Sequence, residues 1–320
     1  MSSNEQISLE KQNLDRLDKI TESIRIQPKK YEINIPLAIY YPINRAVLET
    51  SLELPGNKPG VLHACKQALD GVQITFKSFF QWFRVSEDLE NEERRDNSDY
   101  RDKGLEAVRQ AIYSLMPGFA NLRVRRSPLR MTVNKNGNEL IVNQLSDGEK
   151  CLLAMVGDLA RRLAIANPKL DEPLQGEGVV LIDEIELHLH PQWQRGIISA
   201  LTRTFPNCQF IVTTHSPQIV SHVQPENIYV LASTDDEIIA QRPSSSYGRD
   251  SNRILEDLME TPARPQKIKD KILELFRIID SGDLEAAKQL RARIVKEIGA
   301  DEPELVKADV FMQRKAILKR

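Results

Sequence analysis

The sequence has 320 residues, of which 41% are hydrophobic and 28% are charged, a composition typical of globular proteins with one large or two ordinary domains. The formal net charge of −2 argues against a protein that binds nucleic acid through its overall charge. The N-terminus lacks an apolar signal core, no segment reaches the roughly 20 apolar residues of a membrane span, and the three cysteines lack metal-binding or disulfide spacing. We therefore expect a cytoplasmic protein with no membrane partner.

The beginning of the chain predicts a surface helix followed by a strand. Residues 5–25 carry apolar side chains at helical spacing among charges, and Pro28 ends that pattern. The apolar run 33–41 is typical of a strand in a sheet that is buried on both faces. We interpret residues 1–45 as the helix and central strand of an α/β lobe.

Residues 46–120 predict a helical insertion in that lobe. The aromatic cluster at 76–83 is expected to pack in the core. The charged run at 87–103 behind it is expected to form a solvated helical arm or a mobile loop.

Residues 121–143 predict strands and turns, with Asn136-Gly137-Asn138 as a hairpin signal. Strand alternation places two arginines of this region on one face, where they would follow the phosphates of a nucleic acid. The favoured alternative is a charged edge strand that faces solvent. The two arginines on one face are Arg123 and Arg125, and the same region also contains Arg126 and Arg130.

The run Leu-Ser-Asp-Gly-Glu-Lys at 145–150 predicts a helix N-terminus. Ser146 is a good N-cap, Gly148 lets a phosphate approach the backbone, and the following helix has a continuous apolar face. Free amides at a helix N-terminus attract anions. An ordinary capped core helix is the alternative interpretation.

The apolar run 178–184 ends in two adjacent carboxylates, Asp183 and Glu184. Such a pair suits the carboxyl edge of a parallel sheet, where ligands bind. We expect Asp183 to hold Mg²⁺ through water, and Glu184 to orient and deprotonate a water that attacks a terminal phosphate. A helix N-cap is the structural alternative.

A third apolar strand is predicted at 209–213 and ends next to His215, which precedes Ser216-Pro217. This histidine is expected on a loop at the same sheet edge as Glu184. There it would donate a hydrogen bond to a terminal phosphate.

The chain beyond residue 230 predicts a hairpin that turns at 233–236, a linker at 243–248, and helices to the end. Apolar stripes at 268–279 and 284–298 are separated by Ser281-Gly282-Asp283. They predict an antiparallel helix pair, which is typical of a docking or oligomerisation element.

Taken together, these motifs resemble an ABC-type ATPase head of the structural-maintenance-of-chromosomes and overcoming-lysogenisation-defect kind. The motif at 145–150 resembles the signature motif, 179–184 the Walker B segment, 186–191 the D-loop, and His215 the switch histidine. Outside this span, the segments 39–42 and 247–252 and the region of Trp82 are similar to the predicted ATP-binding proteins that accompany Septu and retron anti-phage systems.

This resemblance implies an α/β fold, the C-terminal part of an ABC-ATPase-type P-loop fold with a mostly parallel sheet, a helical insertion and a C-terminal helical hairpin. Residues 121–240 would form the lobe that carries the four motifs, and residues 241–320 the C-terminal helical region. The implied ligands are ATP and Mg²⁺. The implied partners are a second ATPase head, in a homodimer or higher oligomer, and an effector nuclease on another chain.

The resemblance also assigns site residues. In such heads two subunits enclose ATP, and the signature turn of one faces the Walker loop of the other. The implied roles are ATP binding in trans by Ser146, Gly148 and Glu149, metal binding by Asp183, catalysis by Glu184 and His215, and D-loop contacts across the dimer by Glu186, His188 and His190. A metal site made by the two D-loop histidines is the disfavoured alternative.

The sequence departs from the pattern because it contains no GxxxxGK[ST] phosphate loop. The nearest candidate, at 56–60, has the wrong spacing and a proline in place of an amide donor. The chain is expected to be a fragment whose first lobe lies upstream; a head that contributes only in trans is the alternative.

We therefore expect the C-terminal portion of an ATP-hydrolysing head that dimerises around ATP and gates an effector in anti-phage defence. A catalytically degenerate head that acts as a scaffold or regulatory module is the alternative. A nuclease in this chain itself is disfavoured, because the region after residue 230 lacks the pattern of strands and carboxylates that a two-metal site needs.

Overall fold

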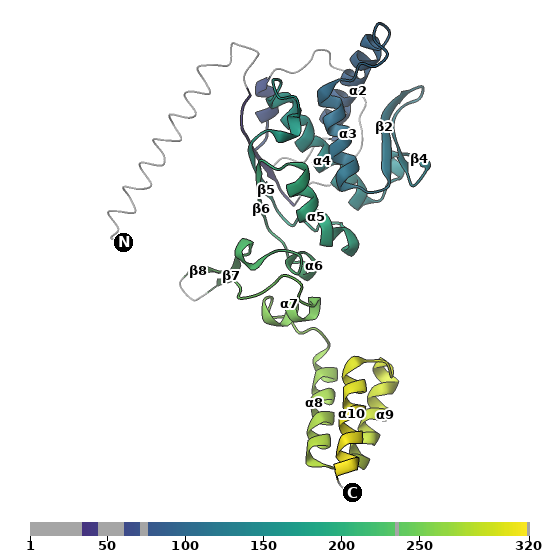
Figure 1. Ribbon diagram of the computed structural model, residues 1–320, viewed down its shortest axis with the longest axis vertical. Coiled ribbons are helices and arrows are strands. Elements are labelled where there is room, and N and C mark those ends of the chain that lie inside the picture. The colour runs from purple at the N-terminus through teal and green to yellow at the C-terminus, as the bar shows by residue number, and fades with distance from the viewer. Residues whose placement is uncertain (1–33, 44–60, 71–75, 234–236, 319–320) are drawn as a thin grey trace, which may run out of the picture. The chain divides into compact units, whose positions relative to one another are not determined.

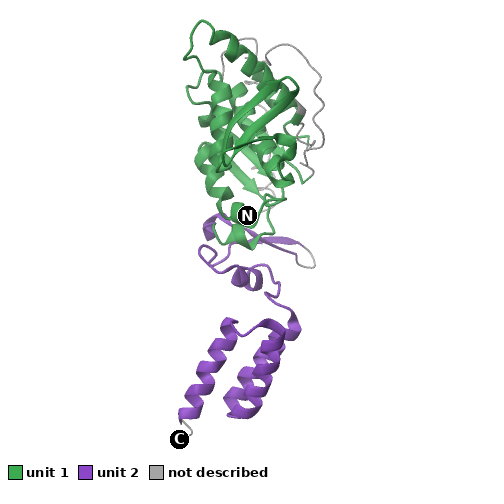
Figure 2. Ribbon diagram, turned by 90° about the vertical axis from the view of Figure 1, so that its right-hand side faces the viewer, with its two compact units in different colours: residues 1–222 green, residues 223–320 purple. Residues whose placement is uncertain are grey.

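The computed structural model describes residues 34–43, 61–70, 76–233 and 237–318, and the helix expected at 5–25 lies outside them. The chain divides between His222 and Val223 into two compact units, which are coloured separately in Figure 2. Element labels follow Figure 1.

The first unit contains a parallel sheet with strand order β1-β5-β6. Its strands are β1 (Leu37–Tyr41), β5 (Gly178–Ile182) and β6 (Cys208–Val212). The last residues of the three strands lie in register, so the segments that follow them leave the sheet at one edge. This sheet and the helices around it confirm the predicted α/β class.

The faces of this sheet differ in burial. Leu37 and Ile39 are 3% and 1% exposed, whereas Ala38 between them is exposed. Val179 and Ile211, on the neighbouring strands, are also exposed. The expectation of a strand buried on both faces is therefore wrong for the described residues, because side chains alternate along a strand and the described elements cover one face.

The helix α4 (Asp147–Ala166) is the central helix of the first unit, and it contacts β1, α2 (Phe76–Glu93) and α3 (Lys103–Leu115), as Figure 1 shows. The apolar face predicted for α4 is confirmed, since its members are at most 4% exposed: Leu152, Met155, Val156, Leu159 and Leu163.

The aromatic cluster of α2 packs in the core, as predicted. Phe79 and Phe83 are fully buried, and their rings contact one another at a centroid distance of 5.9 Å. A Cβ added at Gly157 of α4 would lie 2.7 Å from the Phe79 ring, so glycine is needed for this close helix packing.

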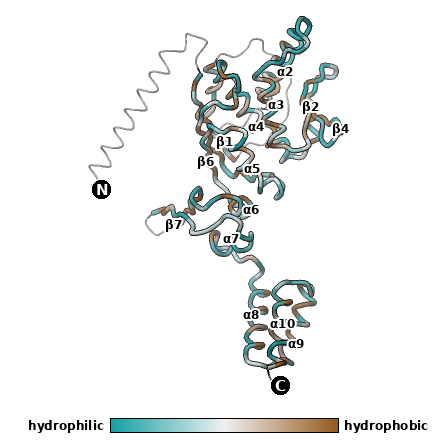
Figure 3. Tube along the Cα trace, viewed as in Figure 1, coloured by the Kyte–Doolittle hydropathy of each residue, from teal (hydrophilic) through white to brown (hydrophobic). Residues whose placement is uncertain are grey.

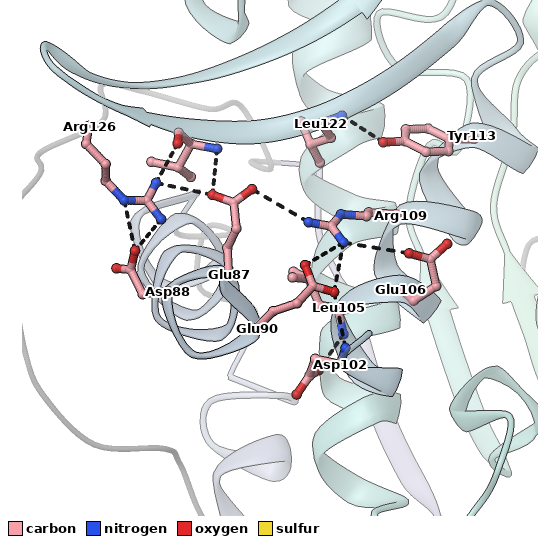
Figure 4. A network of polar contacts seen from close by, with 11 residues as sticks. Glu87, Asp88, Glu90, Asp102, Leu105, Glu106, Arg109, Tyr113, Leu122 and Arg126 are labelled. Carbon is pink, nitrogen blue, oxygen red and sulfur yellow. Dashed lines mark hydrogen bonds and ion pairs between the residues drawn. The ribbon is translucent and has the colours of Figure 1, made fainter. Parts of the chain in front are cut away.

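The charged run behind this cluster is not simply a solvated arm, and that expectation is wrong for Glu87 and Glu90. They are 6% and 2% exposed, and Arg109 of α3 contacts them at 3.6 and 3.0 Å, respectively. Arg126 adds a second contact to Glu87 at 3.1 Å (Figure 4). Buried carboxylates require such partners, so these ion pairs fasten α2 to α3 and to the strand that carries Arg126.

An antiparallel sheet with the order β2-β3-β4 precedes α4. It consists of β2 (Phe119–Arg126), β3 (Leu129–Lys135) and β4 (Asn138–Ile141). Asn136 and Gly137 have φ angles of 50° and 86°, which confirms the predicted hairpin turn. The other elements of this unit are η1 (Val61–Cys65), η2 (Val142–Gln144), η3 (Pro173–Gln175), α5 (Pro191–Thr204) and α6 (Pro217–Val220).

The second unit contains a hairpin and helices. Its elements are η4 (Pro225–Asn227), β7 (Val230–Ser233), β8 (Ile238–Gln241), α7 (Ser251–Asp257), α8 (Gln266–Ser281), α9 (Leu284–Ile298) and α10 (Pro303–Leu318). The hairpin is confirmed; of its predicted turn at 233–236, Ser233 ends β7 and residues 234–236 lie outside the described residues. None of the described helices is long and apolar enough to span a bilayer.

The predicted helix pair at the C-terminus is part of a group of three helices, because α10 packs on α8 and α9. Leu305 and Ala308 of α10 are buried in this core, whereas Val306 and Val310 are about half exposed. Figure 3 shows apolar and polar residues mixed along α10. The predicted helical end of the chain is thus confirmed, but the apolar residues of α10 do not form a single stripe, so the sequence did not predict its packing on the pair.

Candidate functional site

Three predicted site residues meet at the carboxyl edge of the parallel sheet. Asp183 and Glu184 directly follow β5, and His215 lies on the loop after β6. The backbone N–H of Asp183 donates to the carbonyl of Tyr41 at 2.9 Å and extends the β1–β5 pairing. The two acidic side chains therefore leave the sheet from a fixed backbone position.

Glu184 and His215 contact one another, with 3.2 Å between Oε1 and Nε2. The Glu184 side chain is 25% exposed and that of His215 is 88% exposed. Glu184 has a φ of 45°, a left-handed conformation that is uncommon outside glycine, and its N–H donates to the Thr213 hydroxyl at 2.9 Å. The turn thus holds a sheltered carboxylate beside an imidazole that is open to solvent.

The environment of Glu184 favours its protonated form. Burial is the largest cause that raises its pKa, and the negative charge of Glu186 raises it further, while His215 lowers it. A carboxylate with a raised pKa is a better proton acceptor when ionised. This is the electrostatic character expected of a general base.

Glu186, the first residue of the segment predicted as the D-loop, joins that segment to the histidine loop. Its carboxylate accepts hydrogen bonds from the Thr214 hydroxyl at 2.6 Å and from the backbone N–H of His215 at 2.5 Å. Gln194 of α5 adds a second link, because it accepts from the Ser216 hydroxyl at 2.7 Å. The position of His215 is therefore tied to that of the D-loop.

Asp183 is held by two hydroxyl groups that the sequence analysis did not include in the site. The Tyr40 hydroxyl donates to Oδ2 at 2.6 Å, and the Thr213 hydroxyl donates to Oδ1 at 3.2 Å. Both residues lie at the carboxyl ends of strands adjacent to β5. The sequence could have indicated both residues, because each lies at the end of a predicted strand of the parallel sheet that carries Asp183.

The predicted signature turn forms the capped N-terminus of α4. The Ser146 hydroxyl accepts from the N–H of Glu149 at 3.3 Å, and the Glu149 carboxylate accepts from the N–H of Ser146 at 3.0 Å. Glu149 also pairs with Lys135 of β3 at 2.5 Å. Burial alone would raise the pKa of Glu149, but the bonds from Lys135 and Ser146 lower it.

Gly148 in this turn lies directly against the predicted D-loop. A Cβ at this position would lie 2.1 Å from the carbonyl oxygen of His188. His190, at the end of the same segment, is the N-cap of α5, and its Nδ1 accepts from the N–H of Gln192 at 3.2 Å. The segment 186–190 therefore contacts both the signature turn and the histidine loop.

The donor set suits a loosely held divalent cation. Within the described ranges, no group of three or more His, Cys, Asp or Glu side chains could hold a metal ion by itself. Mg²⁺ is commonly bound by one or two carboxylates together with substrate phosphates and water. Asp183, at the strand end, fits this mode as the protein's contribution.

Three of the four arginines considered for nucleic acid pair with acidic side chains of the chain. Arg123 and Arg125 lie on one face, as predicted, and both pair with Glu139, at 3.1 and 2.8 Å. Arg126 pairs with Asp88 and Glu87. Arg130 is opposite Arg125 in the β2–β3 register. Contact of these arginines with nucleic acid stays a prediction.

Comparison with known proteins identifies the family. Residues 59–221, about half of the chain, match the AAA_21 family, described as "AAA domain, putative AbiEii toxin, Type IV TA system". Among solved structures, the SMC head domain from Thermotoga maritima aligns with 48% of this chain and 52% of its own, at 17% identity and a TM-score of 0.34.

Curated relatives include two retron proteins. The Retron Ec83 probable ATPase of Escherichia coli is 41% identical over 225 residues, which are 68% of this chain and 41% of that protein. The Retron Vc95 probable ATPase of Vibrio cholerae serotype O1 biovar El Tor is 32% identical over 297 residues, which are 78% of this chain and 57% of that protein. Septu protein PtuA of Bacillus thuringiensis is 30% identical over 143 residues, which are 42% of this chain and 36% of that protein.

This chain thus spans about half the length of the two retron relatives. The family match and the relatives confirm the resemblance that the motifs indicated. The chain belongs to the AAA_21 family of AAA-type ATPase domains and is a homologue of the retron ATPases and of Septu protein PtuA.

Proposed function

We propose that this chain is the part of an ATP-hydrolysing head that carries the catalytic carboxylate. The observation that carries the proposal is the contact between Glu184 and His215 at a sheet edge that also holds Asp183. The family match supports an ATPase, and this edge offers the groups that hydrolysis of a terminal phosphate requires.

Each group has a distinct role in this proposal. Glu184 accepts the proton of the attacking water, and general-base catalysis of this kind contributes about 10²–10⁴-fold in rate. His215 donates a hydrogen bond to the terminal phosphate. Asp183 holds Mg²⁺, which when bound neutralises charge on the phosphate oxygens.

A second copy of the head completes the site. The N-terminus of α4 is the positive end of a long helix, where Ser146 is exposed and Gly148 and Glu149 are buried directly behind it, and this end favours an anion held by a facing subunit. Because the 320 residues contain no GxxxxGK[ST] loop, the loop that cradles the phosphates would come from outside this sequence. The contact of Gly148 with the D-loop supports coupling between closure of two heads and the catalytic edge.

The biological role that fits the relatives is gating of an effector, a nuclease on another chain, in anti-phage defence. The second unit, with its three packed helices, is the proposed docking element. None of the three cysteines forms a disulfide in the part of the chain that the structure describes, which suits the reducing cytoplasm.

A scaffold without turnover is the second candidate, and the exposed apolar side chains of α10 favour it. Such a head would keep its fold and its helices for a partner but would not hydrolyse ATP. The exposed Val306, Val310 and Phe311 of α10 offer apolar surface for that purpose.

The test is ATP hydrolysis by the head assembled with the phosphate loop that it requires, as wild type and as Glu184→Gln, with binding of labelled ATP measured in parallel. The variant should keep ATP binding and lose turnover by about 10²–10⁴-fold. The matched control is Glu177→Gln, which should behave as wild type. Glu177 is exposed and lies just before the amino end of β5, whereas Glu184 follows its carboxyl end. Unchanged turnover in Glu184→Gln removes Glu184 from the mechanism. An assembled wild-type head that does not bind ATP but co-purifies with a partner supports the scaffold.

A further inference from the structure

The Asp183 carboxylate lies between hydroxyl groups from both neighbouring strands. Tyr40 of β1 donates to one oxygen at 2.6 Å, and Thr213, which follows β6, donates to the other at 3.2 Å. A carboxylate held at both oxygens cannot rotate freely. Since an ionised carboxylate has about four lone-pair positions, two donors fix its plane and still allow it to accept from metal-bound water.

Tyr40 is well placed to fix that plane. Its distance to Asp183 is in the range of strong hydrogen bonds from a hydroxyl to an ionised carboxylate. Its backbone is held as well, because its N–H donates to the Ala68 carbonyl at 2.8 Å. The neighbours Ile39 and Tyr41 are buried, so the strand around Tyr40 is rigidly packed.

We propose that Tyr40 is a positioning residue for the metal site, which holds the Asp183 carboxylate in the orientation that receives Mg²⁺ or its water ligands. This inference rests on the proposed function, because it takes Asp183 as the metal carboxylate. Groups that hydrogen-bond to a metal-binding carboxylate orient it, and their removal commonly weakens metal affinity by about 10–100-fold.

The chain supplies a matched control in the next residue. Tyr41 points to the opposite face of β1, where its hydroxyl donates to Asp158 of α4 at 3.1 Å. Asp158 also pairs with Arg161 and Arg162 inside the fold. Tyr41→Phe therefore removes the same chemical group from the same strand without touching Asp183.

The experiment measures Mn²⁺ binding to the full chain by electron paramagnetic resonance, with and without ATPγS. Tyr40→Phe should weaken Mn²⁺ binding about 10-fold. Tyr41→Phe should leave the affinity within about two-fold of wild type and instead lower the melting temperature by about 2–4 °C. Asp183→Asn serves as the positive control and should abolish binding.

A second measurement uses the wild-type fold. In chain labelled with ¹³C in the tyrosine rings, Mn²⁺ should broaden the resonance that Tyr40→Phe removes more than the one that Tyr41→Phe removes. The inference would be overturned if Tyr40→Phe bound Mn²⁺ with wild-type affinity or if both variants weakened Mn²⁺ binding equally. It would also be overturned if Mn²⁺ broadened neither tyrosine resonance selectively, with or without ATPγS.

These outcomes are separable from those of the proposed function. If Glu184→Gln abolishes turnover while Tyr40→Phe binds Mn²⁺ like wild type, the positioning role of Tyr40 is wrong and the proposed ATPase function is supported. If the wild-type chain shows no turnover but its Mn²⁺ binding depends on Tyr40, the ATPase fails and the positioning role stands.

Discussion

Gly148 and His188 approach so closely that the carbonyl oxygen of His188 occupies the space where a side chain at position 148 would begin. A Cβ there would lie 2.1 Å from this oxygen and 3.0 Å from its carbon. The obstacle is backbone, which cannot rotate away as the end of a long side chain can. The glycine of the signature turn is therefore required within one subunit, independently of any phosphate that it meets.

Gly148→Ala should separate the signature turn from the D-loop and lower the free energy of unfolding by about 1–3 kcal/mol. The matched control is Gly196→Ala in α5, where an added Cβ meets nothing within 4 Å. That control should stabilise the chain by about 0.4–1 kcal/mol, because alanine restricts the unfolded chain. Urea denaturation of both variants measures the two changes. A Gly148→Ala variant as stable as the control would show that the contact is loose.

The pH profile of hydrolysis should respond in opposite directions to changes at the two neighbours of Glu184. The carboxylate must be ionised to act as a base, and its pKa is raised, first by burial and then by Glu186, whereas His215 lowers it. Activity is lost as the pH falls through this raised pKa. Glu186→Gln should move the acid limb to lower pH, and His215→Ala should move it to higher pH. Rate measurements between pH 5 and 8 decide this, and a shift in the same direction for both variants would contradict it.

The strand ends and the capped helix were predictable because each has a local signal. Asp183 and Glu184 follow an apolar run, and Ser146 with Glu149 forms the capping pattern that the structure contains. Parallel pairing then carries Asp183 and the residues after β6 to one edge. Local chemistry and sheet topology together were enough for this part of the site.

The contacts of Tyr40, Glu90 and Gly148 could not be predicted from local sequence signals. Each depends on a partner far along the chain, namely Asp183, Arg109 and His188. A charged residue in a helical pattern gives no sign of which neighbouring helix will cover it. The burial of Glu90 in particular arises from the packing of α2 against α3.

Asp158 should contribute strongly to stability, and its contribution should depend on pH. Burial alone would raise its pKa, but the charges of Arg161 and Arg162 lower it below its ordinary value. Its stabilising effect is therefore present above the unfolded pKa and is lost as the pH falls through the folded pKa. Asp158→Asn leaves the buried Arg161 without its carboxylate partner, and it should cost about 3–5 kcal/mol at neutral pH.

Below about pH 4, where the carboxylate of the unfolded chain becomes protonated, the difference between wild type and Asp158→Asn should begin to shrink, and it should continue to shrink until the pH passes the lowered pKa of the folded state. Urea denaturation at several pH values measures it. Asp171→Asn is the control, because its ion pair with Lys103 is almost fully exposed and should matter little. A difference that is constant from pH 7 to pH 3 would contradict the role of the charge.

Glu90 and Glu106 contact the same guanidinium of Arg109 but differ in burial. Their side chains are 2% and 41% exposed, and their distances to Arg109 are 3.0 and 3.6 Å. Glu90 also accepts the N–H of Asp102 at 3.1 Å, so it joins α2 to the start of α3 (Figure 4).

Glu90→Gln should cost about 1.5–3 kcal/mol, because it removes the charge from a buried hydrogen bond to arginine. Glu106→Gln should cost about 0–1 kcal/mol, because solvent screens the exposed pair. Urea denaturation measures both values, and limited proteolysis of the exposed segment 91–99 reports whether α2 has loosened. Equal costs for the two variants would mean that the network does not fasten α2. A larger cost at Glu90, together with faster cleavage, would identify Arg109 as the residue that fastens α2 to α3.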